Sequence, residues 1–444
     1  MTTKADDARG RRTAWFAVGF LTLAATLSTV DRQILALMIG PIRRDLAITD
    51  SQIGLLGGLA FSLLYTVFTL PAAWLADRRS RRAVVTGGLL LWSAMTAVCG
   101  LTHRFLALFL ARMGVGLGES ALSPAAYSMM SDLFPRERLP NAIGVFAAAP
   151  FLGVGLANIV GGQVIQHFET TGPMILPILG PVRSWQVMFL ALGLPGVALA
   201  AFGWLTLREP LRRGAGAVGR ATPLTFSQAV GFFAGRKRFL ALHFTAFIAL
   251  AIQGWCLFFW IVEFLVRERG ADRGRAGLIY GVMAFALGLA GSVVAGRLAS
   301  GRAAQARPDI TLRLTLASVL ALGPLAIAAP LAPRDWQVLT LLAPVTFLMG
   351  WPAGLGTTAL QFIVPGELKG RVIALYLLVV NFVSLSLGPL LGGLISDRLF
   401  HGRSLGGSLC LMAAVDYPVA AVCLLLALRP FRRALVQAAL WEAG

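Results

Sequence analysis

The sequence predicts an all-α membrane protein with twelve transmembrane helices arranged as two pseudo-symmetric six-helix bundles. Three observations lead to this prediction: the composition, the recurrence of long apolar runs, and an internal repeat. Of the 444 residues, 57% are hydrophobic and 13% are charged, and the mean hydropathy is +0.76. Because globular domains average about 25% charged residues, this composition indicates a protein that lies largely within a lipid bilayer.

Apolar runs of about 20 residues, which are long enough for a helix to cross a bilayer, recur throughout the chain. They predict twelve spans, at 13–40, 51–76, 82–102, 105–133, 138–167, 185–207, 238–266, 274–299, 311–331, 336–364, 370–396 and 405–429.

The two halves of the chain repeat each other in part. Gly54 and Gly58 of the second span recur as Gly277 and Gly281 of the eighth, and internal repeats of this kind are common in transporters. The segment after the sixth span is rich in basic residues, proline and glycine, which is typical of a linker. The expected domains are a first bundle at 1–207, a cytoplasmic linker at 208–237 and a second bundle at 238–444.

The formal net charge of +19 is compatible with a nucleic-acid partner, but its distribution favours another explanation. Lys and Arg lie in short segments on alternate sides of the apolar runs, as the positive-inside rule predicts. We therefore expect no nucleic-acid partner and both termini in the cytoplasm. The N-terminal basic segment is not followed by a small-residue cleavage site, so we expect a retained first span in a multi-pass protein of the bacterial inner membrane.

The sequence carries no motif for enzyme chemistry. Its four cysteines lie in apolar runs without metal-ligand or CxxC spacing, and we interpret them as small buried hydrophobic residues. Walker, HExxH and GxSxG motifs are missing. A lipid-modifying enzyme would need a nucleophile or a metal site near the membrane interface. We therefore expect neither an enzyme nor a metal or organic cofactor.

A charged pair interrupts the fourth apolar run, in the stretch Arg112-Met-Gly-Val-Gly-Leu-Gly-Glu119-Ser120. Each ion costs roughly 2.5–3.5 kcal/mol near a bilayer centre, so charges there indicate function. Helical positions seven apart share a face, about 10 Å apart, so Arg112 and Glu119 point the same way. Three glycines between them would let a neighbouring helix or a ligand approach closely: Gly114, Gly116 and Gly118.

The first span carries matching partners, Asp31 and Arg32. Two acids and two bases are together neutral and can be buried as pairs. Protonating Asp31 or Glu119 frees an arginine and leaves a net positive site in low dielectric, which an anionic substrate group could neutralise. The four charges therefore predict a proton switch at the centre of a membrane transporter, with Arg32 and Arg112 as the charge partners of the two acids.

Polar and aromatic side chains in other spans are candidates for a substrate cavity. Tyr127 follows Pro124, which should kink the fourth span, and it is either a packing aromatic or a ligand contact. Asn158 lies among glycines in the uncharged fifth span, where packing and cavity lining fit equally well. The second half supplies the remaining candidates: Gln253, Trp255, Trp351, Gln361 and Asn381.

Two further acids lie in apolar runs of the second half. Glu263 is near the outer end of the seventh span, and we interpret it as solvated at the membrane interface. Asp416 lies within the twelfth span, and the sequence offers no physical account of an acid there.

The loop after the second span resembles the major facilitator superfamily signature Gly-xxx-Asp-Arg-x-Gly-Arg-Arg, with Ala73 and Ser80 in place of the two glycines. An acid between two close helices can face the positive end of a helix dipole, and arginines favour the anionic cytoplasmic lipid surface. The resemblance implies a loop that latches the inner side of the two halves together. Its expected gate residues are Asp77, Arg78, Arg81 and Arg82.

Three motifs together resemble the Spinster (Spns) lipid transporters of that superfamily: Asp31-Arg32, Gly118-Glu119-Ser120 and Ser131-Asp132-Leu133-Phe134. The resemblance implies the major facilitator fold, a monomer, and proton-coupled movement of lysophospholipids or sphingoid lipids by alternating access. It also implies that Asp31 and Glu119 are the protonation sites.

Other functions remain open. Another branch of the superfamily also carries Asp-Arg in span one and Glu in span four, and arginines bind carboxylates as well as phosphates, which fits an organic-anion:proton symporter. A multidrug efflux protein would share the apolar cavity without requiring Arg112. A non-transporting membrane receptor would bind its ligand without net flux.

Overall fold

The computed structural model describes residues 4–135, 138–171, 174–176, 180–210, 226–300, 309–364 and 366–443, and most of them are helical. Within these ranges, twelve helical stretches are long and apolar enough to cross a membrane. They match the predicted spans, with ends that differ by up to three residues except in the twelfth span, which ends at Ala438 where the prediction ends at 429. The prediction of an all-α protein with twelve spans is confirmed.

The chain divides into two compact units. The first comprises Met1–Gly214 with Val262–Val282, and the second comprises Ala215–Ile261 with Met283–Gly444. The end of the seventh span and the start of the eighth therefore group with the first half of the chain. The expected linker at 208–237 is described in part, since residues 211–225 lie outside the described ranges.

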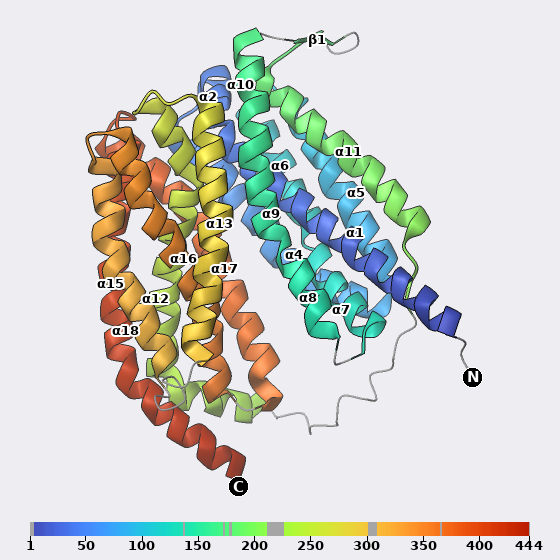
Figure 1. The fold of residues 1–444 in the computed structure, drawn as a ribbon, viewed down its shortest axis with the longest axis vertical. Coiled ribbons are helices and arrows are strands. Elements are labelled where there is room, and N and C mark those ends of the chain that lie inside the picture. Colours follow the sequence, from blue (N-terminus) through green and yellow to red (C-terminus); the bar gives the residue numbers. More distant parts are fainter. Residues whose placement is uncertain are drawn as a thin grey trace. The chain divides into compact units, whose positions relative to one another are not determined.

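The second, fourth and fifth spans are interrupted helices. Figure 1 shows α8, α9 and α10 following one another in line, so that they form one span. In chain order the elements are α1 (Lys4–Leu37), α2 (Ile39–Leu46), α3 (Asp50–Gly57), α4 (Leu59–Arg78), α5 (Arg81–Cys99), α6 (Phe105–Glu119), α7 (Leu122–Leu133), α8 (Leu139–Ala147), α9 (Ala149–Leu156), the π-helix η1 (Ala157–Gly161), α10 (Gly162–Thr171), the antiparallel strands β1 (Met174–Leu176) and β2 (Gly180–Val182), and α11 (Ser184–Thr206).

The interruption between α6 and α7 follows from Pro124. Proline has no backbone N–H, so the carbonyl of Ser120, four residues earlier, lacks its helical donor. The chain tightens there, and the amide of Ala121 donates to the carbonyl oxygen of Gly118 at 3.3 Å. The expected kink is thus a break just before Pro124, which leaves Glu119 as the last residue of α6.

The glycines of α6 bring neighbouring helices into close contact. A Cβ at Gly116 would lie 2.1 Å from the carbonyl oxygen of Phe61 in α4, and one at Gly118 would lie 2.5 Å from the backbone nitrogen of Trp92 in α5. A Cβ at Gly114 would meet Met95 of α5 at 2.6 Å. The predicted close approach is confirmed, and it fixes the helix that carries both Arg112 and Glu119.

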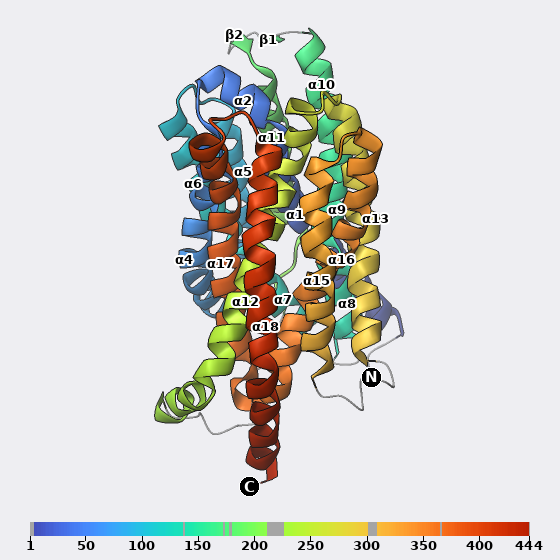
Figure 2. The same ribbon diagram turned by 90° about the vertical axis from the view of Figure 1, so that its left-hand side faces the viewer.

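The second unit is built from longer helices, and Figure 2 shows α18 as one of them. Within this unit α15 packs along α16 and α18. Gly388 and Gly392 let α17 approach α12 closely, and the Trp260 indole donates to the carbonyl oxygen of Pro389 at 2.9 Å. The remaining helices, of which α12 and α13 are shared between the units, are α12 (Phe226–Arg267), α13 (Arg273–Ser300), α15 (Ile310–Leu331), α16 (Asp335–Ile363), α17 (Gly366–Leu399) and α18 (Leu405–Ala443).

Candidate functional site

The four charged residues predicted to form one cluster come together between α1 and α6, as two separate ion pairs. Arg112 Nη1 lies 3.2 Å from Asp31 Oδ2, and both residues are buried. Arg32 Nε lies 3.5 Å from Glu119 Oε2. Each acid of one helix is therefore paired with a base of the other, and the whole cluster belongs to the first unit.

Ser28 connects the second pair. Its hydroxyl donates to Glu119 Oε2 at 2.6 Å and accepts from Arg32 Nη2 at 3.1 Å. Ser28 and Arg32 lie one helical turn apart, so their side chains share a face of α1. Glu119 is buried, whereas the Arg32 side chain keeps 29% of its surface exposed. Arg32 is thus the charged group of the cluster that a ligand can reach most directly.

An aromatic ring lies beside both arginines. The guanidinium carbons of Arg32 and Arg112 are 5.2 and 5.9 Å from the centre of the Phe61 ring, within the range of a cation–π interaction. Phe61 in turn stacks on Tyr65, with ring centres 5.2 Å apart. The ring stabilises both cations without using their N–H donors, which stay available to carboxylates and ligands.

Three buried atoms of the cluster have no hydrogen-bond partner among the described residues: Asp31 Oδ1, Glu119 Oε1 and Arg112 Nε. Buried polar atoms are nearly always hydrogen-bonded, and an unsatisfied one costs about 1–3 kcal/mol. Protonation would lower that cost for a carboxylate, because it removes the charge that must be compensated. The role of Asp31 and Glu119 as protonation sites remains a prediction.

A cavity of about 160 Å³ lies beside the second pair, inside the first unit. Arg32 and Glu119 lie in its wall, and so does the exposed Tyr127. Asp31 and Arg112 are not among the lining residues. Hydroxyl and apolar side chains complete the wall, among them Ser28, Thr29, Tyr65, Ser123, Phe146 and Pro150.

The geometry around Arg32 defines what the pair can do chemically. With Glu119 ionised, the pair is neutral. A protonated Glu119 would leave the guanidinium its charge, and an anion in the cavity could then pair with it. A planar guanidinium pairs with a carboxylate or a phosphate through two parallel hydrogen bonds, so both classes of anion fit this chemistry.

Asn158 is not among the residues that line this cavity. It is buried in η1, and its side-chain amide donates to the carbonyl oxygen of Val154 at 2.9 Å. Two glycines of α13 pass close to it: a Cβ at Gly277 would lie 2.7 Å from its backbone oxygen, and one at Gly281 would lie 2.7 Å from its own Cβ. The structure thus places Asn158 at a close helix crossing.

The predicted cavity residues of the second half lie in the second unit and differ in exposure. Gln253 is buried and Trp351 half-buried, and neither Gln253 Oε1 nor the Trp351 indole nitrogen has a hydrogen-bond partner among the described residues. Trp255 packs edge-on against Phe258, whereas Gln361 and Asn381 are exposed. Their contact with a substrate remains a prediction.

The sequence matches the family model of the Major Facilitator Superfamily over residues 21–389. The chain belongs to this superfamily. It is therefore an integral, multi-pass membrane protein of a transporter family, as its twelve apolar helices also indicate.

Three relatives in this superfamily show the range of its members. The chain is 30% identical to a protein named MFS-type efflux pump from Mycolicibacterium smegmatis, over 98% of this chain and 97% of that protein. It is 29% identical to a probable L-galactonate transporter of Escherichia coli, over 65% of this chain and 62% of that one. It is 23% identical to sphingosine-1-phosphate transporter SPNS2 of Danio rerio, over 87% and 77% of the two chains.

A solved structure supports the expected branch. The structure is that of a bacterial homologue of the human lysosomal transporter Spinster, in an inward-facing and unoccupied conformation. It matches this chain with a TM-score of 0.78 and 25% identity, over 96% of this chain and 97% of that one. The predicted resemblance to the Spinster transporters is confirmed.

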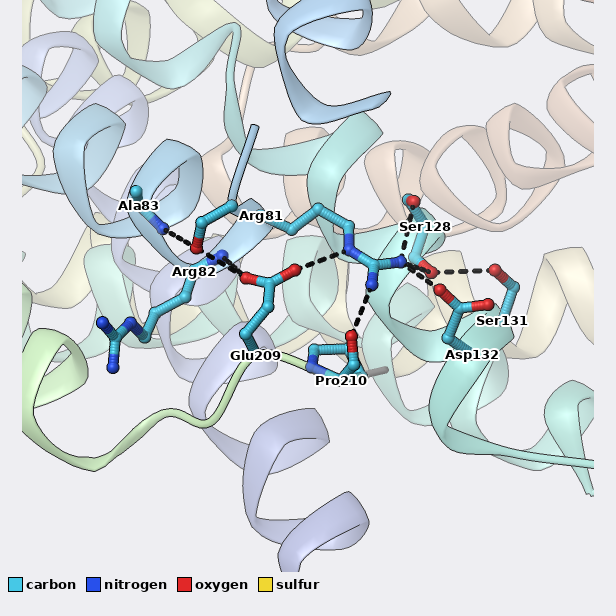
Figure 3. Close-up of polar contacts among 9 residues, drawn as sticks. Arg81, Arg82, Ala83, Ser128, Ser131, Asp132, Glu209 and Pro210 are labelled. Carbon is cyan, nitrogen blue, oxygen red and sulfur yellow. Dashed lines mark hydrogen bonds and ion pairs between the residues drawn. The ribbon is translucent and has the colours of Figure 1, made fainter. Parts of the chain in front are cut away.

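The superfamily's signature loop places Arg81 at the centre of a polar network in the first unit (Figure 3). The buried guanidinium donates from Nη1 to the carbonyl oxygen of Ser128 at 3.1 Å and to the carboxylate of Asp132. It donates from Nε to Glu209 Oε1 at 3.0 Å and from Nη2 to the carbonyl oxygen of Pro210 at 2.9 Å. Arg81 therefore joins the start of α5 to the end of α7 and to the chain that follows α11.

Glu209 lies at the amino-terminal end of α5. Its Oε2 accepts from the Ser80 hydroxyl at 2.6 Å and from the Arg82 amide at 2.9 Å, where the helix dipole favours a negative charge. Partial burial alone would raise the pKa of Glu209, but the hydrogen bonds from Ser80, Arg82 and Arg81 outweigh it and hold the pKa below its usual value. The sequence analysis does not identify Glu209. The feature that could have indicated a role for it is that it is a single acid within a basic segment.

The other predicted gate residues lie nearer the surface. Asp77 and Arg78 are exposed, and the Arg78 guanidinium lies 4.4 Å from the centre of the Trp74 ring. Arg82 is half-buried and lies 4.7 Å from the centre of the Trp204 ring. The contacts described here for Arg81 and Arg82 are all made within the first unit, so these two residues organise that unit. Their role as a gate remains a prediction.

A second group of buried charges lies in the first unit, at the end of the second span opposite Arg81. We call it the Asp50 cluster; it consists of Asp50, Glu263, Arg267 and Arg273. Both terminal nitrogens of Arg267 donate to the buried Asp50 carboxylate, at 2.8 and 3.0 Å. Its Nε donates to Glu263 Oε1 at 3.3 Å. Arg273 Nη1 donates to Glu263 Oε2 at 3.0 Å and to the carbonyl oxygen of Leu37 at 2.9 Å.

The Asp50 cluster corrects the interpretation of Glu263. Its surface is 3% exposed, so solvation at the interface does not stabilise its charge; the two arginines do. Sequence reasoning could not find this partnership, because Arg267 and Arg273 lie at the ends of α12 and α13, where charge is ordinary. What brings them together is the packing of these helix ends against α2 and α3.

Proposed function

We propose that the protein is a proton-coupled secondary active transporter that moves an amphiphilic anion by alternating access. The expected substrate is a lysophospholipid or a sphingoid-type lipid. The observation that carries the proposal is the position of Arg32. Its partly exposed side chain lies in a cavity wall, and its ion-pair partner is the buried acid Glu119. Family membership supports transport, and this site supports coupling between a proton and an anion.

In the proposed cycle, Arg32 exchanges one partner for another. Protonated Glu119 no longer neutralises Arg32, and the anionic group of the substrate takes its place. Loss of the proton returns Arg32 to Glu119 and weakens the hold on the anion, because two negative groups then compete for one cation. Asp31, behind the cavity wall, is the second proposed protonation site. The cycle needs no metal or organic cofactor, and a single chain contains all of these groups.

The cavity supports recognition of a headgroup. Its volume of about 160 Å³ equals the volume that roughly five water molecules occupy in liquid water. Pockets that enclose drug-sized ligands are larger, at roughly 300–1,000 Å³. A phosphate or carboxylate headgroup fits this space, and Leu122, Phe146 and Pro150 offer apolar surface to the start of an alkyl chain. The lipid phosphate in the name of the Danio rerio relative is consistent with this substrate class.

An organic-anion:proton symporter is the second candidate. The small volume of the cavity favours it, since a compact carboxylate fits there as a whole molecule, and the Escherichia coli relative is named for such a substrate. Multidrug efflux is the third candidate, in line with the name of the Mycolicibacterium smegmatis relative.

The distribution of basic residues supports a setting for this activity. We propose a monomer in the bacterial inner membrane with both termini in the cytoplasm, as the positive-inside rule predicts. Labelling of a cysteine added before Lys4 tests the orientation: an impermeant thiol reagent should reach it in inverted vesicles and not in intact cells.

The experiment that tests the proposal uses purified protein in liposomes with an imposed pH gradient. A labelled lysophospholipid, galactonate and a cationic drug are followed with the native protein, with Arg32→Gln, and with Arg104→Gln as a control at an exposed arginine. We expect gradient-dependent movement of the lipid that is lost in Arg32→Gln and kept in Arg104→Gln. Carboxylate flux without lipid movement would identify the symporter, and drug movement that survives Arg32→Gln would identify the efflux protein.

A further inference from the structure

One intramembrane acid takes no part in the proposed cycle and lies in the second unit. Asp416 is eleven residues into α18, about 17 Å along the helix from its start, within a membrane-spanning stretch. Its Oδ2 is enclosed and has no hydrogen-bond partner among the described residues. No basic side chain of the described residues compensates its charge.

Asp416 lies on the packed face of α18. Ala413 and Ala420, about one turn before and after it, are completely buried. Val415, Val419 and Val422 form the exposed face of the same helix. Asp416 itself is half-buried, and its Oδ2 is enclosed. The carboxyl therefore faces neighbouring helices and not the lipid-facing side of α18.

The titratable groups around Asp416 do not supply a positive charge. Cys256 of α12 and Tyr417 of α18 interact with it electrostatically, and both are buried. Tyr417 lies over Gly323 of α15. The charged residues of α15, α16 and α17, such as Arg313, lie within two turns of the helix ends, and the next charge along α18 is Arg429.

We propose that Asp416 is a proton-binding site of the second unit, separate from Glu119 and Asp31, and that its proton is taken up and released during transport. An ionised carboxylate without a counter-charge is costly inside a membrane, so closed packing holds the neutral acid. Uptake converts the carboxylate and a hydronium ion into a carboxylic acid and water, and no other reactant is needed. Release follows when the packing of α12 and α18 around Oδ2 loosens enough to admit water. This proposal rests on the proposed function, because a cycle driven by a pH gradient gives the proton its role.

This site differs in kind from the cluster around Arg32. Protonation of Glu119 leaves an arginine without its partner, so it prepares the first unit to bind an anion. Protonation of Asp416 removes a charge and frees no cation. Asp416 therefore affects the energy of the packed second unit without contacting the substrate, and Asp416→Asn should imitate the proton-loaded state at nearly the same volume.

Infrared difference spectroscopy on the protein in liposomes, between acid and alkaline pH, tests the site directly. We expect a carboxylic-acid carbonyl band that titrates in the native protein, persists in the control Asp335→Asn at an exposed acid, and is lost in Asp416→Asn. Thermal unfolding of the same variants shows whether each is folded. An Asp416→Asn spectrum that keeps every titrating band would overturn the proposal.

Gradient-driven uptake at a series of pH values tests the role in transport. We expect Asp416→Asn to lose one titrating step from the pH profile while substrate exchange at equal pH is unchanged. A lost infrared band with a native pH profile would refute the role in transport. Loss of the infrared band with no gradient-driven flux in the native protein would support the proton site and contradict the proposed function.

Discussion

The two arginines of the central cluster have the same charge and different surroundings. Arg112 is buried with Asp31 and is kept from the cavity, whereas Arg32 lies in the cavity wall and shares Ser28 with Glu119. A buried ion pair is costly to break, since the remaining partner is left as an uncompensated charge. Breaking the inner pair, Asp31 with Arg112, is therefore expected to cost stability, whereas the outer pair, Glu119 with Arg32, can exchange its partner for a ligand in the cavity.

This difference predicts the behaviour of variants at the inner pair. We expect Asp31→Asn to destabilise the protein by about 3–5 kcal/mol, because it leaves Arg112 buried and unpaired. The double variant Asp31→Asn/Arg112→Gln should recover much of that loss. Thermal unfolding of the purified protein measures both effects. A single variant as stable as the native protein would show that Arg112 has another partner.

The members of the cluster can be predicted from the sequence, but their pairing cannot. Arg112 and Glu119 stand out because charges are rare in apolar runs, and a spacing of seven places them on one face of a helix. Which acid meets which base depends on how α1 is shifted along α6, and that shift is set by packing between helices. The cavity depends in the same way on α7, α8 and α9, which are distant from α1 in sequence.

Close packing of α6 is the main feature at the scale of elements. Its glycines touch the backbones of α4 and α5, so the positions of Arg112 and Glu119 depend on backbone contact. The twelve spans could be predicted from apolar runs, because length and composition determine which segments can cross a bilayer. The breaks within them could be predicted less well. The missing N–H of Pro124 accounts for the break between α6 and α7, whereas no sequence feature that we recognise predicts the π-helix η1.

The glycine contacts predict a clear contrast between two substitutions. We expect Gly116→Ala to destabilise the protein by about 1–3 kcal/mol, because its Cβ would overlap the carbonyl oxygen of Phe61 and force α4 and α6 apart. Gly87→Ala in α5 is the control, since a Cβ there meets nothing within 4 Å, and it should be neutral or slightly stabilising. Equal unfolding temperatures for the two variants would contradict the close packing of α6.

The network around Arg81 predicts a pH dependence at the start of α5. Hydrogen bonds hold the pKa of Glu209 below its ordinary value of 4.5, so the folded protein favours the ionised form. The stabilisation is present above that pH and is lost as the pH falls through the lowered pKa. Hydrogen exchange at the amides of Arg82 and Ala83 measures it, with Glu209→Gln as the reference at each pH. We expect the native protein to be better protected at neutral pH and the two to converge in acid; a constant difference would contradict this role of Glu209.

At the scale of the whole molecule, the two units carry different kinds of charge. The first holds the Asp31/Arg32/Arg112/Glu119 cluster, the Arg81 network and the Asp50 cluster, all of which pair acids with bases. The second also pairs an acid with bases, since Asp309 lies beside Arg313 and Arg432. Within a membrane span, however, it holds Asp416, whose charge no basic side chain of the described residues compensates. Sequence reasoning places the charge-paired centre in the first half because all four of its charges lie in the first and fourth spans. The sequence does not reveal that the end of α12 and the start of α13 group with the first unit. That grouping depends on the Asp50 cluster and on the close contacts of Gly277 and Gly281 with Asn158.

The central claim is that protonation of Glu119 drives transport by releasing Arg32. The most direct test compares native protein and Glu119→Gln in liposomes, for accumulation driven by a pH gradient and for exchange of labelled substrate at equal pH. The neutral amide of this variant would imitate the protonated acid permanently. We therefore expect Glu119→Gln to lose gradient-driven accumulation by at least about tenfold, which corresponds to about 1.4 kcal/mol, and to keep exchange at equal pH. Accumulation by Glu119→Gln at the native rate would contradict the account.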